Sequence, residues 1–429
     1  MALLLKGGRV VDPGSGIDGI LDVIVRDGRI VEVGEGLSIP KGETIDCAEK
    51  VVLPGLVDAH THLREPGRED EETIESGTHA AARGGFTAVC AMPNTDPVCD
   101  TGSVVRFVVE RAAERGVVRV YPIGAMTTGQ RGEALAEIGD MVAEGAVAFS
   151  DDGHSVSDAG MMRLVMDYVK RFSRPVVSHC EDVTLVGRGV VDEGETSTRL
   201  GLPGWPAVAE ETVVARDLAL AELTGCRLHL AHLSTAGSVR LVREARERGV
   251  DVTCEVTPHH LFLDTTALSG YDTDLKMNPP LRPPADREAL VTALLDGTID
   301  CIATDHAPHA AHEKEREFEL APFGTTGLET ALSLVVTHLV APGLADWADV
   351  ARWLCHGPRR ALGLPEMRLE AGMEADITVV DPEARIEVTP EWFVSRSRNS
   401  AFLGAKLLGK ASEVLVSGRF ALRNGKVPA

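Results

Sequence analysis

His60 and His62 are the first residues along the chain whose type and spacing suggest chemistry. They end the apolar run GLVDAHTH. Side chains two positions apart on a β-strand point to the same side, so both imidazoles should face one centre. Two imidazoles on one face form a metal-chelating arrangement. An isolated His-X-His pair can also arise by coincidence. A metal site is indicated only if other strands also end in residues that can bind a metal.

Three further metal-ligand types end apolar runs later in the chain. His179 ends VVSHCED, His232 ends LHLAHLS, and Asp305 lies in IATDHAP. Each alone is more often a hydrogen-bonded core residue than a ligand. Four histidines and one aspartate at equivalent strand ends favour a site for zinc or a similar divalent ion.

Two adjacent carboxylates, Asp151 and Asp152, end another run, AVAFSDDG. Neighbouring side chains on a strand point in opposite directions, so only one of the two can face the metal centre. With Asp152 inward, its carboxylate would lie between the two pairs of histidines and could bridge two metals. Asp151 would then support the following loop. The alternative interpretation of Asp-Asp-Gly is a simple turn.

Four other polar residues near strand ends suit an anionic, amide-containing substrate: Arg64, Asn94, Asn278 and His309. The planar guanidinium of Arg64 matches a carboxylate, and the two asparagines can pair with amides. Arg64 could instead form a surface ion pair, and the asparagines, beside prolines, could be turn residues.

The segments that would carry these residues alternate in type. Between 54 and 367, eight strand-like runs alternate with amphipathic helical stretches such as 104–115 and 238–248, which predicts a (β/α)8 barrel. A doubly wound open sheet is the alternative, but each run ends in polar residues, as at the mouth of a barrel. The terminal segments, 1–53 and 368–429, show strand patterns and the turn pairs Asp27-Gly28 and Asn424-Gly425. We expect them to form one composite β-sandwich domain.

Composition narrows the class of protein. The 429 residues carry a formal net charge of −22, which argues against binding to nucleic acid or to an anionic membrane. No apolar run approaches membrane-spanning length, and eight scattered cysteines without a Cys-X-X-Cys pair are typical of a reduced, cytoplasmic protein. Neither a nucleotide-binding glycine motif nor a nucleophile elbow is present.

Three motifs resemble those of the cyclic amidohydrolases, and most closely the type I bacterial dihydroorotases: DAHTHLREPG at 58–67, CAMPNTDP at 90–97 and ATDHAPHAAHEK at 303–314. The resemblance covers essentially the whole chain. It implies reversible, zinc-dependent hydrolysis of (S)-dihydroorotate to N-carbamoyl-L-aspartate, a step of pyrimidine biosynthesis, with one or two zinc ions per chain.

The resemblance also implies a role for each candidate residue. His60, His62 and Asp305 would bind one zinc, and His179 and His232 the second, with Asp305 also transferring the proton. Arg64, Asn94 and His309 would hold the substrate carboxylate, with Asn278 near the ring.

One position departs from many relatives. Hydantoinases and allantoinases bridge their metals with a carbamylated lysine on the fourth strand, whereas this chain has Asp152, as type I dihydroorotases do. A hydantoinase or allantoinase activity is therefore the second hypothesis. A third is a non-catalytic, dihydroorotase-like partner of aspartate carbamoyltransferase, although such partners lose metal ligands that this chain keeps. We also expect a homo-oligomer, and leave open whether aspartate carbamoyltransferase is a partner.

Overall fold

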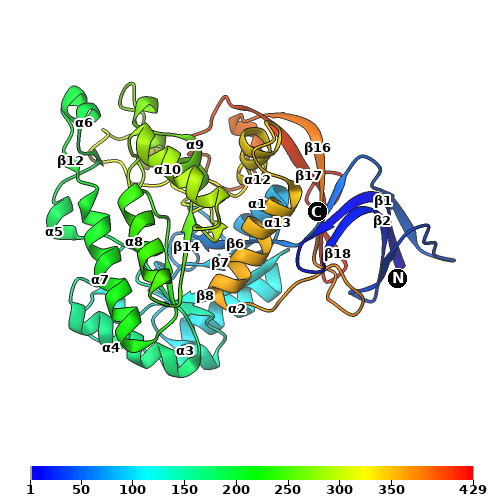
Figure 1. Ribbon diagram of the computed structural model, residues 1–429, viewed down its shortest axis with the longest axis horizontal. Helices are drawn as coiled ribbons and strands as arrows, with labels where there is room; N and C mark the ends of the chain where they lie inside the picture. Colours follow the sequence, from blue (N-terminus) through cyan, green and yellow to red (C-terminus); the bar gives the residue numbers. More distant parts are fainter. Residues whose placement is uncertain (1, 429) are drawn as a thin grey trace.

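Eight parallel strands from the middle of the chain form a barrel in the computed structural model, which describes residues 2–428 (Figure 1). They pair in chain order: β6 (Leu56–Thr61), β7 (Phe86–Ala91), β8 (Arg119–Gly124), β9 (Ala148–Phe149), β10 (Val176–Ser178), β13 (Leu228–Leu230), β14 (Val252–Val256) and β15 (Cys301–Ile302). A bridge between Thr61 and His306 and a 2.9 Å hydrogen bond from the backbone N of His62 to the carbonyl of His306 join the last strand to the first. The barrel prediction is confirmed, and the open sheet is excluded.

The barrel strands are buried on both faces, which is why they read as nearly continuous apolar runs. All six residues of β7 are buried, for example. The barrel interior is filled by small and branched side chains from alternate positions, including Val57, Ala88, Ile123 and Val177. The interior is therefore a packed core, and the active-site groups gather at its carboxyl-terminal mouth.

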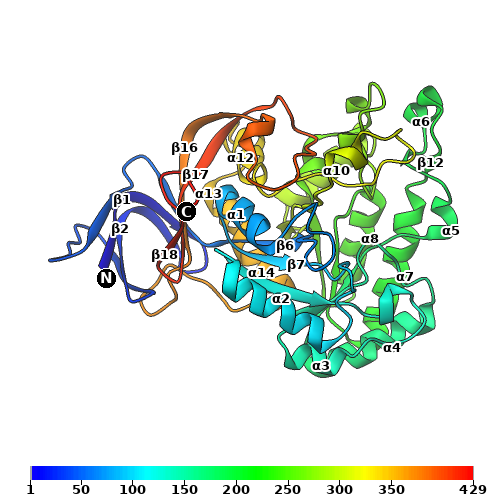
Figure 2. The same cartoon turned by 180° about the vertical axis from the view of Figure 1, so that it is seen from behind.

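Helices surround the barrel on the outside (Figures 1 and 2). The longest is α7 (Val208–Thr224), and the two stretches expected to be helical are observed as α2 (Gly102–Arg115) and α8 (Ala236–Glu247). In α8, Val239, Val242 and Ala245 are buried at helical spacing, and the hydroxyl of Thr235 caps the first turn.

The remaining helical segments are no longer than α8. The α-helices are α1 (Ile74–Gly84), α3 (Ile138–Ala143), α4 (Ala159–Val169), α5 (Val183–Val186), α6 (Glu195–Leu200), α9 (Pro258–Phe262), α10 (Pro284–Leu295), α11 (Ala311–Lys314), α12 (Ala331–Val335), α13 (Trp347–Ala351) and α14 (Gly357–Leu362). The π-helical turns η5 (Val336–Val340) and η6 (Arg352–His356) extend α12 and α13. The 3-10 turns are η1 (Thr128–Gln130), η2 (Lys170–Phe172), η3 (Thr265–Ala267), η4 (Thr273–Leu275) and η7 (Pro390–Trp392).

Both ends of the chain build a second, eight-stranded sheet beside the barrel (Figures 1 and 2). Its strands are β1 (Ala2–Asp12), β2 (Ile17–Arg26), β3 (Arg29–Gly34), β4 (Glu43–Asp46), β5 (Val51–Pro54), β16 (Ile377–Glu387), β17 (Lys406–Val416) and β18 (Arg419–Leu422). Antiparallel pairing of β5 with β16 joins the amino-terminal strands to the carboxyl-terminal ones. This confirms the expected composite β-unit, whereas its exact boundaries in the chain stay a prediction.

The two turn pairs lie where the sequence indicates. Asp27 and Gly28 connect β2 to β3 with φ angles of 51° and 80°, and Asn424 and Gly425 have φ angles of 50° and 69°. Positive φ at both central residues characterises the tight turn that matches the twist of a β-hairpin.

All eight cysteines are buried and free. Among the described residues, no helix is both long enough and apolar enough to cross a bilayer.

Phe86, at the start of β7, tests the packing of the core because its side chain is fully buried. We expect Phe86→Ala to destabilise the protein by about 3–5 kcal/mol, since the change leaves a cavity. Calorimetry should show a clearly lower melting temperature. Leu223→Ala, at a side chain that is 63% exposed, is the matched control and should melt within about a degree or two of the wild type. Equal melting temperatures would contradict this view of the core.

Candidate metal centre and anion site

Four histidines converge at the carboxyl-terminal mouth of the barrel. His60 lies on β6 and His62 just after it, while His179 follows β10 and His232 follows β13. The ring centroids lie 5.3 Å apart for His60 and His62, 5.2 Å for His60 and His232, and 4.8 Å for His179 and His232. Residues up to 172 positions apart in sequence thus share one centre, because their strands end at the same rim.

The carboxylate of Asp152 lies between the four rings. Its Oδ1 is 3.3 Å from Nε2 of His60, 3.5 Å from Nε2 of His232 and 3.6 Å from Nδ1 of His179. Its Oδ2 is 3.4 Å from Nε2 of His62. The side chain therefore faces the barrel axis, in the register that strand alternation indicates.

Asp151 points the other way. Its Oδ1 accepts hydrogen bonds from the backbone N–H groups of Met126 (2.8 Å) and Thr127 (3.1 Å), and its Oδ2 accepts one from the Thr127 hydroxyl. These contacts support the loop after β8. The two adjacent carboxylates thus occupy different environments.

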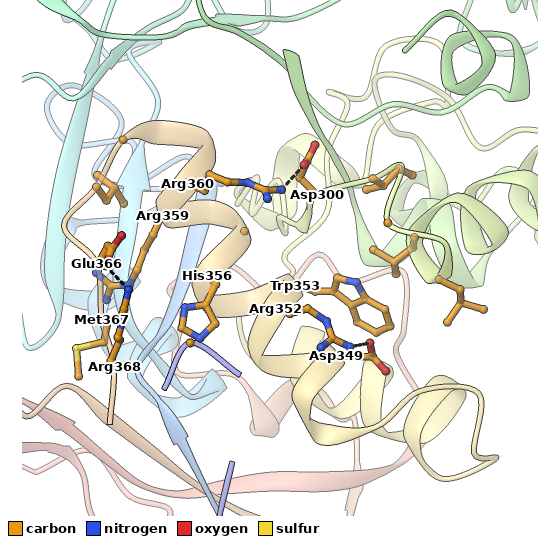
Figure 3. Close-up of a pocket in the computed structure, with 18 of the residues that line it drawn as sticks. Asp300, Asp349, Arg352, Trp353, His356, Arg359, Arg360, Glu366, Met367 and Arg368 are labelled. Atoms are coloured by element: carbon orange, nitrogen blue, oxygen red, sulfur yellow. Dashed lines mark hydrogen bonds and ion pairs between the residues drawn. The ribbon is translucent and has the colours of Figure 1, made fainter. Parts of the chain in front are cut away.

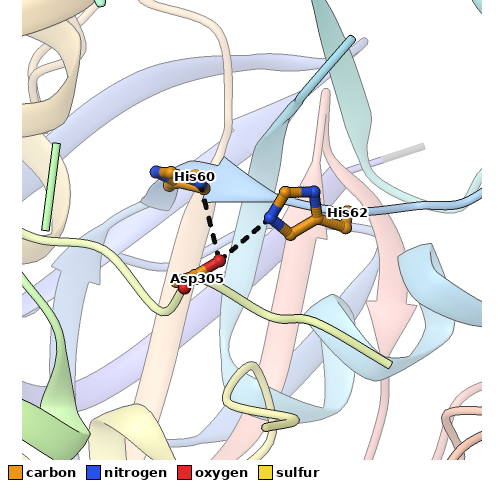
Figure 4. Close-up of side chains that lie close together, drawn as sticks. All are labelled: His60, His62 and Asp305. Carbon is orange, nitrogen blue, oxygen red and sulfur yellow. Dashed lines mark hydrogen bonds and ion pairs between the residues drawn. The ribbon is translucent and has the colours of Figure 1, made fainter. Parts of the chain in front are cut away.

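Asp305 approaches the same centre from the last barrel strand (Figure 4). Its Oδ1 lies 2.9 Å from Nε2 of His62 and 3.6 Å from Nε2 of His60. Asp305 and His232 have positive φ angles of 47° and 34°, as does Arg64 at 60°. Such backbone strain in non-glycine residues concentrates at functional sites.

Three of the four histidines have a hydrogen-bond partner at the ring nitrogen that faces away from the centre. Nδ1 of His60 lies 2.9 Å from Glu255, and Nε2 of His179 lies 2.9 Å from Glu181. Nδ1 of His62 lies 2.8 Å from Oδ1 of Asn94. An acceptor on the outer nitrogen leaves the inner nitrogen free to coordinate a metal, as in carboxylate–histidine–metal triads.

Glu255 and Glu181 were not singled out by sequence reasoning. Glu255 lies within the strand-like run DVTCEVTPHH, and Glu181 follows the strand in VVSHCED. For Glu255 the usable signal was a carboxylate inside an apolar strand, which is rare unless it is paired. Which histidine each glutamate supports depends on the tertiary fold.

The residues present fit a divalent ion. Nε2 of His60 and Oδ1 of Asp152 are buried and have no hydrogen-bond partner, although they face each other. At this centre, two groups bring ligand atoms within 4.8 Å of one another: His60, His62 and Asp305, and His60, Asp152 and His232. Nitrogen and carboxylate donors of this kind suit zinc and related metals.

The electrostatics of the centre also favour a cation. Burial alone would raise the pKa of Asp152, but the surrounding imidazoles hold it well below its usual range. Burial opposes the charged form of His179, yet contacts with Asp152 and Glu181 outweigh it and raise its pKa to about 10. The carboxylates therefore stabilise positive charge at the centre, which a bound metal supplies in place of protons.

A second cluster lies beside the centre and is organised by the buried carboxylate of Glu71. Its Oε2 is 3.1 Å from Nε of Arg64, and its Oε1 is 2.8 Å from Nδ1 of His309. Nη2 of Arg64 and Nε2 of His309 lie only 3.4 Å apart. Two nitrogen-bearing side chains thus point to one place, which suits a single anion. Glu71 was also missed from the sequence.

His309 has one contact more than a neutral ring can satisfy. Nδ1 faces Glu71, and Nε2 lies 2.8 Å from the carbonyl oxygen of Phe323. Burial, followed by the charges of Arg64 and Lys314, lowers the pKa of His309 to about 3. A neutral imidazole donates only one hydrogen bond. A further anion, bound between Arg64 and His309, would raise this pKa and favour the ring with both nitrogens protonated.

Asn94 and Asn278, which were expected to contact the substrate, form hydrogen bonds to other side chains of the site. Asn94 accepts from His62, and Nδ2 of Asn278 donates to Glu181 at 3.0 Å. Asn94 therefore supports His62 directly, whereas Asn278 supports His179 through Glu181. Oδ1 of Asn278 is buried without a hydrogen-bond partner, so it is left for a ligand.

Comparison with known proteins identifies the family. The family model "Dihydro-orotase-like" matches residues 49–238. A dihydroorotase of Pelotomaculum thermopropionicum is 52% identical over 99% of both chains, and one of Anaeromyxobacter sp. is 50% identical over 99% of this chain and 98% of its own. This chain belongs to the dihydroorotase family. The resemblance found in the sequence motifs is confirmed.

A solved structure shows that the dihydroorotase family shares its architecture with other cyclic amidohydrolases. The L-hydantoinase of Arthrobacter aurescens aligns over 100% of this chain and 97% of its own, with a TM-score of 0.90 at 25% identity. The barrel and the terminal β-unit are thus common to both groups. The metal dependence of these amidohydrolases agrees with the donor groups at the mouth.

A cleft of about 760 Å³ lies away from these residues (Figure 3). Asp300, just before β15, pairs with Arg360 at 2.5 Å. Asp349 pairs with Arg352, and Glu366 lies 2.9 Å from Arg368. These charges neutralise one another, and none of the candidate site residues lines the cleft.

Asp151 and Asp152 allow a matched test of the centre. We expect Asp152→Asn to lower the metal content of purified protein at least severalfold, because an amide is a poor ligand and cannot offset the metal's charge. Asp151→Asn should keep normal metal content and lower the melting temperature instead. Elemental analysis and calorimetry give the two readouts. If Asp151→Asn lost metal and Asp152→Asn kept it, the assignment would be reversed.

Proposed function

We propose that the protein is a zinc-dependent dihydroorotase that catalyses the reversible hydrolysis of (S)-dihydroorotate to N-carbamoyl-L-aspartate. The observation that carries this proposal is that Arg64, which contacts His309, lies near enough to the metal centre for the charges of Asp305 and Asp152 to act on it. Family membership supports the same substrate. The reaction adds water across one ring amide and breaks its C–N bond.

The proposed ligands divide into two sets. His60, His62 and Asp305 would hold one zinc, and His179 and His232 a second, with Asp152 between them. A bound divalent ion polarises an amide carbonyl and makes water a stronger acid by several pKa units. Whether one or two ions are bound is a matter for elemental analysis.

Asp305 is proposed to move the proton. Its carboxylate faces the centre and can accept a proton from the attacking water. It would then deliver that proton to the ring nitrogen as the C–N bond breaks, so that a general base becomes a general acid. In the reverse direction the same carboxyl group takes the proton from the carbamoyl nitrogen.

Arg64, Asn94 and His309 are proposed to hold the substrate carboxylate, with Asn278 near the pyrimidine ring. The carboxylate would replace the Phe323 carbonyl as the acceptor for Nε2 of His309. Fixing the substrate in this way lowers the entropic part of the barrier. Arg64 keeps its ion pair with Glu71 in either case, but a neutral ring would leave the site between Arg64 and His309 without an anion, so the site should discriminate against it.

Two other hypotheses are less well supported. A hydantoinase or allantoinase would use a lysine at the end of β9, where this chain has Asp151 and Asp152. A non-catalytic partner of aspartate carbamoyltransferase would be expected to lack metal ligands, whereas all six are brought together here.

We also propose a cytoplasmic location, which the buried free cysteines support, and a homo-oligomer. Association with aspartate carbamoyltransferase can be tested by mixing the two purified proteins.

The direct test is an assay of dihydroorotate hydrolysis with purified protein, before and after metal removal and zinc addition. We expect activity that is lost with a chelator and restored by zinc. Asp305→Asn should lower kcat by at least about a hundredfold, because an amide cannot carry the proton. Activity within threefold of the wild type would exclude the proposed role of Asp305. A zinc-loaded wild type without activity on dihydroorotate would overturn the proposed function.

Arg64→Met tests the carboxylate contact separately. The change removes the guanidinium but no proposed ligand, so metal content should stay normal. We expect kcat/KM for dihydroorotate to fall by roughly a hundredfold or more, the scale of a lost buried charge-assisted contact. Steady-state kinetics and elemental analysis measure both effects. An unchanged kcat/KM would place the carboxylate elsewhere.

A further inference from the structure

A segment outside the barrel reaches its mouth. Residues 394–400, here called the strap, lie between η7 and β17 in the carboxyl-terminal part of the chain. In Figures 1 and 2 the chain leaves the terminal sheet at β16 and passes over to the barrel before it returns as β17. Within the strap, Ser395, Ser397 and Asn399 are buried, whereas Val394, Arg396 and Arg398 are exposed. This alternation is that of an extended segment with one face against the protein.

The buried serines contact the loop after β6. The hydroxyl of Ser395 donates a hydrogen bond to Oε2 of Glu72. The hydroxyl of Ser397 donates to the backbone carbonyl of Glu71 at 2.7 Å. The carboxylate of Glu71 is the group that contacts both Arg64 and His309. The strap therefore fixes the backbone that carries this carboxylate.

Asn399 contacts the loop after β15. Its Oδ1 accepts a hydrogen bond from the backbone N–H of His309 at 3.0 Å. Its Nδ2 donates to the carbonyls of Ala307 at 3.0 Å and Gly324 at 3.2 Å. Its own carbonyl accepts from the backbone N–H of Thr326 at 2.7 Å. One side chain thus joins the two limbs of this loop on either side of His309.

Close packing makes these contacts specific. Gly324 has φ +127°, and a Cβ there would lie 2.6 Å from the side chain of Ala307 and 3.3 Å from Nε2 of His309. The limbs can approach so closely only because residue 324 is glycine. Loops at a barrel mouth are commonly mobile. Because both the oxygen and the nitrogen of the Asn399 amide form hydrogen bonds to this loop, we expect its motion to be restricted.

We propose that the strap positions the groups that bind the substrate carboxylate, with Asn399 acting through His309 and Ser397 acting through Glu71. The inference rests on the proposed function, because it assigns the carboxylate to Arg64 and His309. It makes affinity for the anionic substrate depend on a segment outside the barrel. The strap makes no hydrogen bond to a proposed metal ligand among the described residues, so the metal centre should be independent of it.

The test compares Asn399→Ala with the wild type in the zinc-loaded, full-length protein. We expect KM for dihydroorotate to rise by about tenfold, the scale of one lost buried hydrogen bond, while kcat stays within about threefold. Metal content should not change. Hydrogen–deuterium exchange should be faster at residues 306–310 and 323–326, and unchanged at the strand ends that carry His179 and His232. Arg398→Lys, a conservative change at the exposed neighbour, should match the wild type in every measurement.

Three outcomes would overturn the inference: an unchanged KM despite faster exchange, unchanged exchange in the loop, or a parallel loss of kcat and metal, which would indicate a general scaffold. Ser397→Ala removes a single hydrogen bond, and it decides the question if Asn399→Ala fails to fold. Its KM should rise by about two- to fivefold with unchanged kcat. Failure of the proposed function is recognised separately, because it would appear as a wild type that does not hydrolyse dihydroorotate.

Discussion

The buried carboxylate of Asp152 is the constraint on which the site depends. Removing a carboxylate from water is costly unless a positive charge compensates it. Four imidazoles surround this carboxylate, and its Oδ1 has no hydrogen-bond partner. The arrangement is stable with protons on the histidines or with a metal between them. Since the inner nitrogens of all four rings lie within 3.6 Å of this carboxylate, a divalent ion bound beside it would meet the requirement.

The position of each imidazole depends in turn on groups behind it. Glu255 holds His60 and also lies 3.0 Å from Nε2 of His229, deeper in the barrel. Burial alone would raise the pKa of Glu255, but its two histidine partners lower it to about 2. Its charge is therefore maintained inside the core. A rigid barrel supplies the geometry, and these buried carboxylates hold the rings in the orientation that coordination needs.

The anion site is also built from charged groups that other groups hold in place, but here the groups that face the ligand are basic. The protein as a whole is strongly acidic, yet Arg64 and His309 converge beside the metal centre. Glu71 orients both, and the strap from the terminal β-unit supports the two loops that carry them. The terminal β-unit therefore contributes to the anion site, and the barrel alone would not complete it.

The sequence by itself determined the repeating elements and most of the candidate site. Alternation with a period of two was enough to place His60 and His62 on one side of a strand and to separate Asp152 from Asp151, because this geometry is local. Polar strand ends were enough to predict the mouth of a barrel. The resemblance of three motifs to those of dihydroorotases implied a role for each candidate residue. The tertiary structure alone decided which groups support these residues, because the pairs His60–Glu255 and His309–Glu71 span 195 and 238 positions. It also decided that Asn94 and Asn278 contact the histidine network, and that Asn399 holds His309. Such contacts depend on how loops pack across the barrel mouth, which no local periodicity encodes.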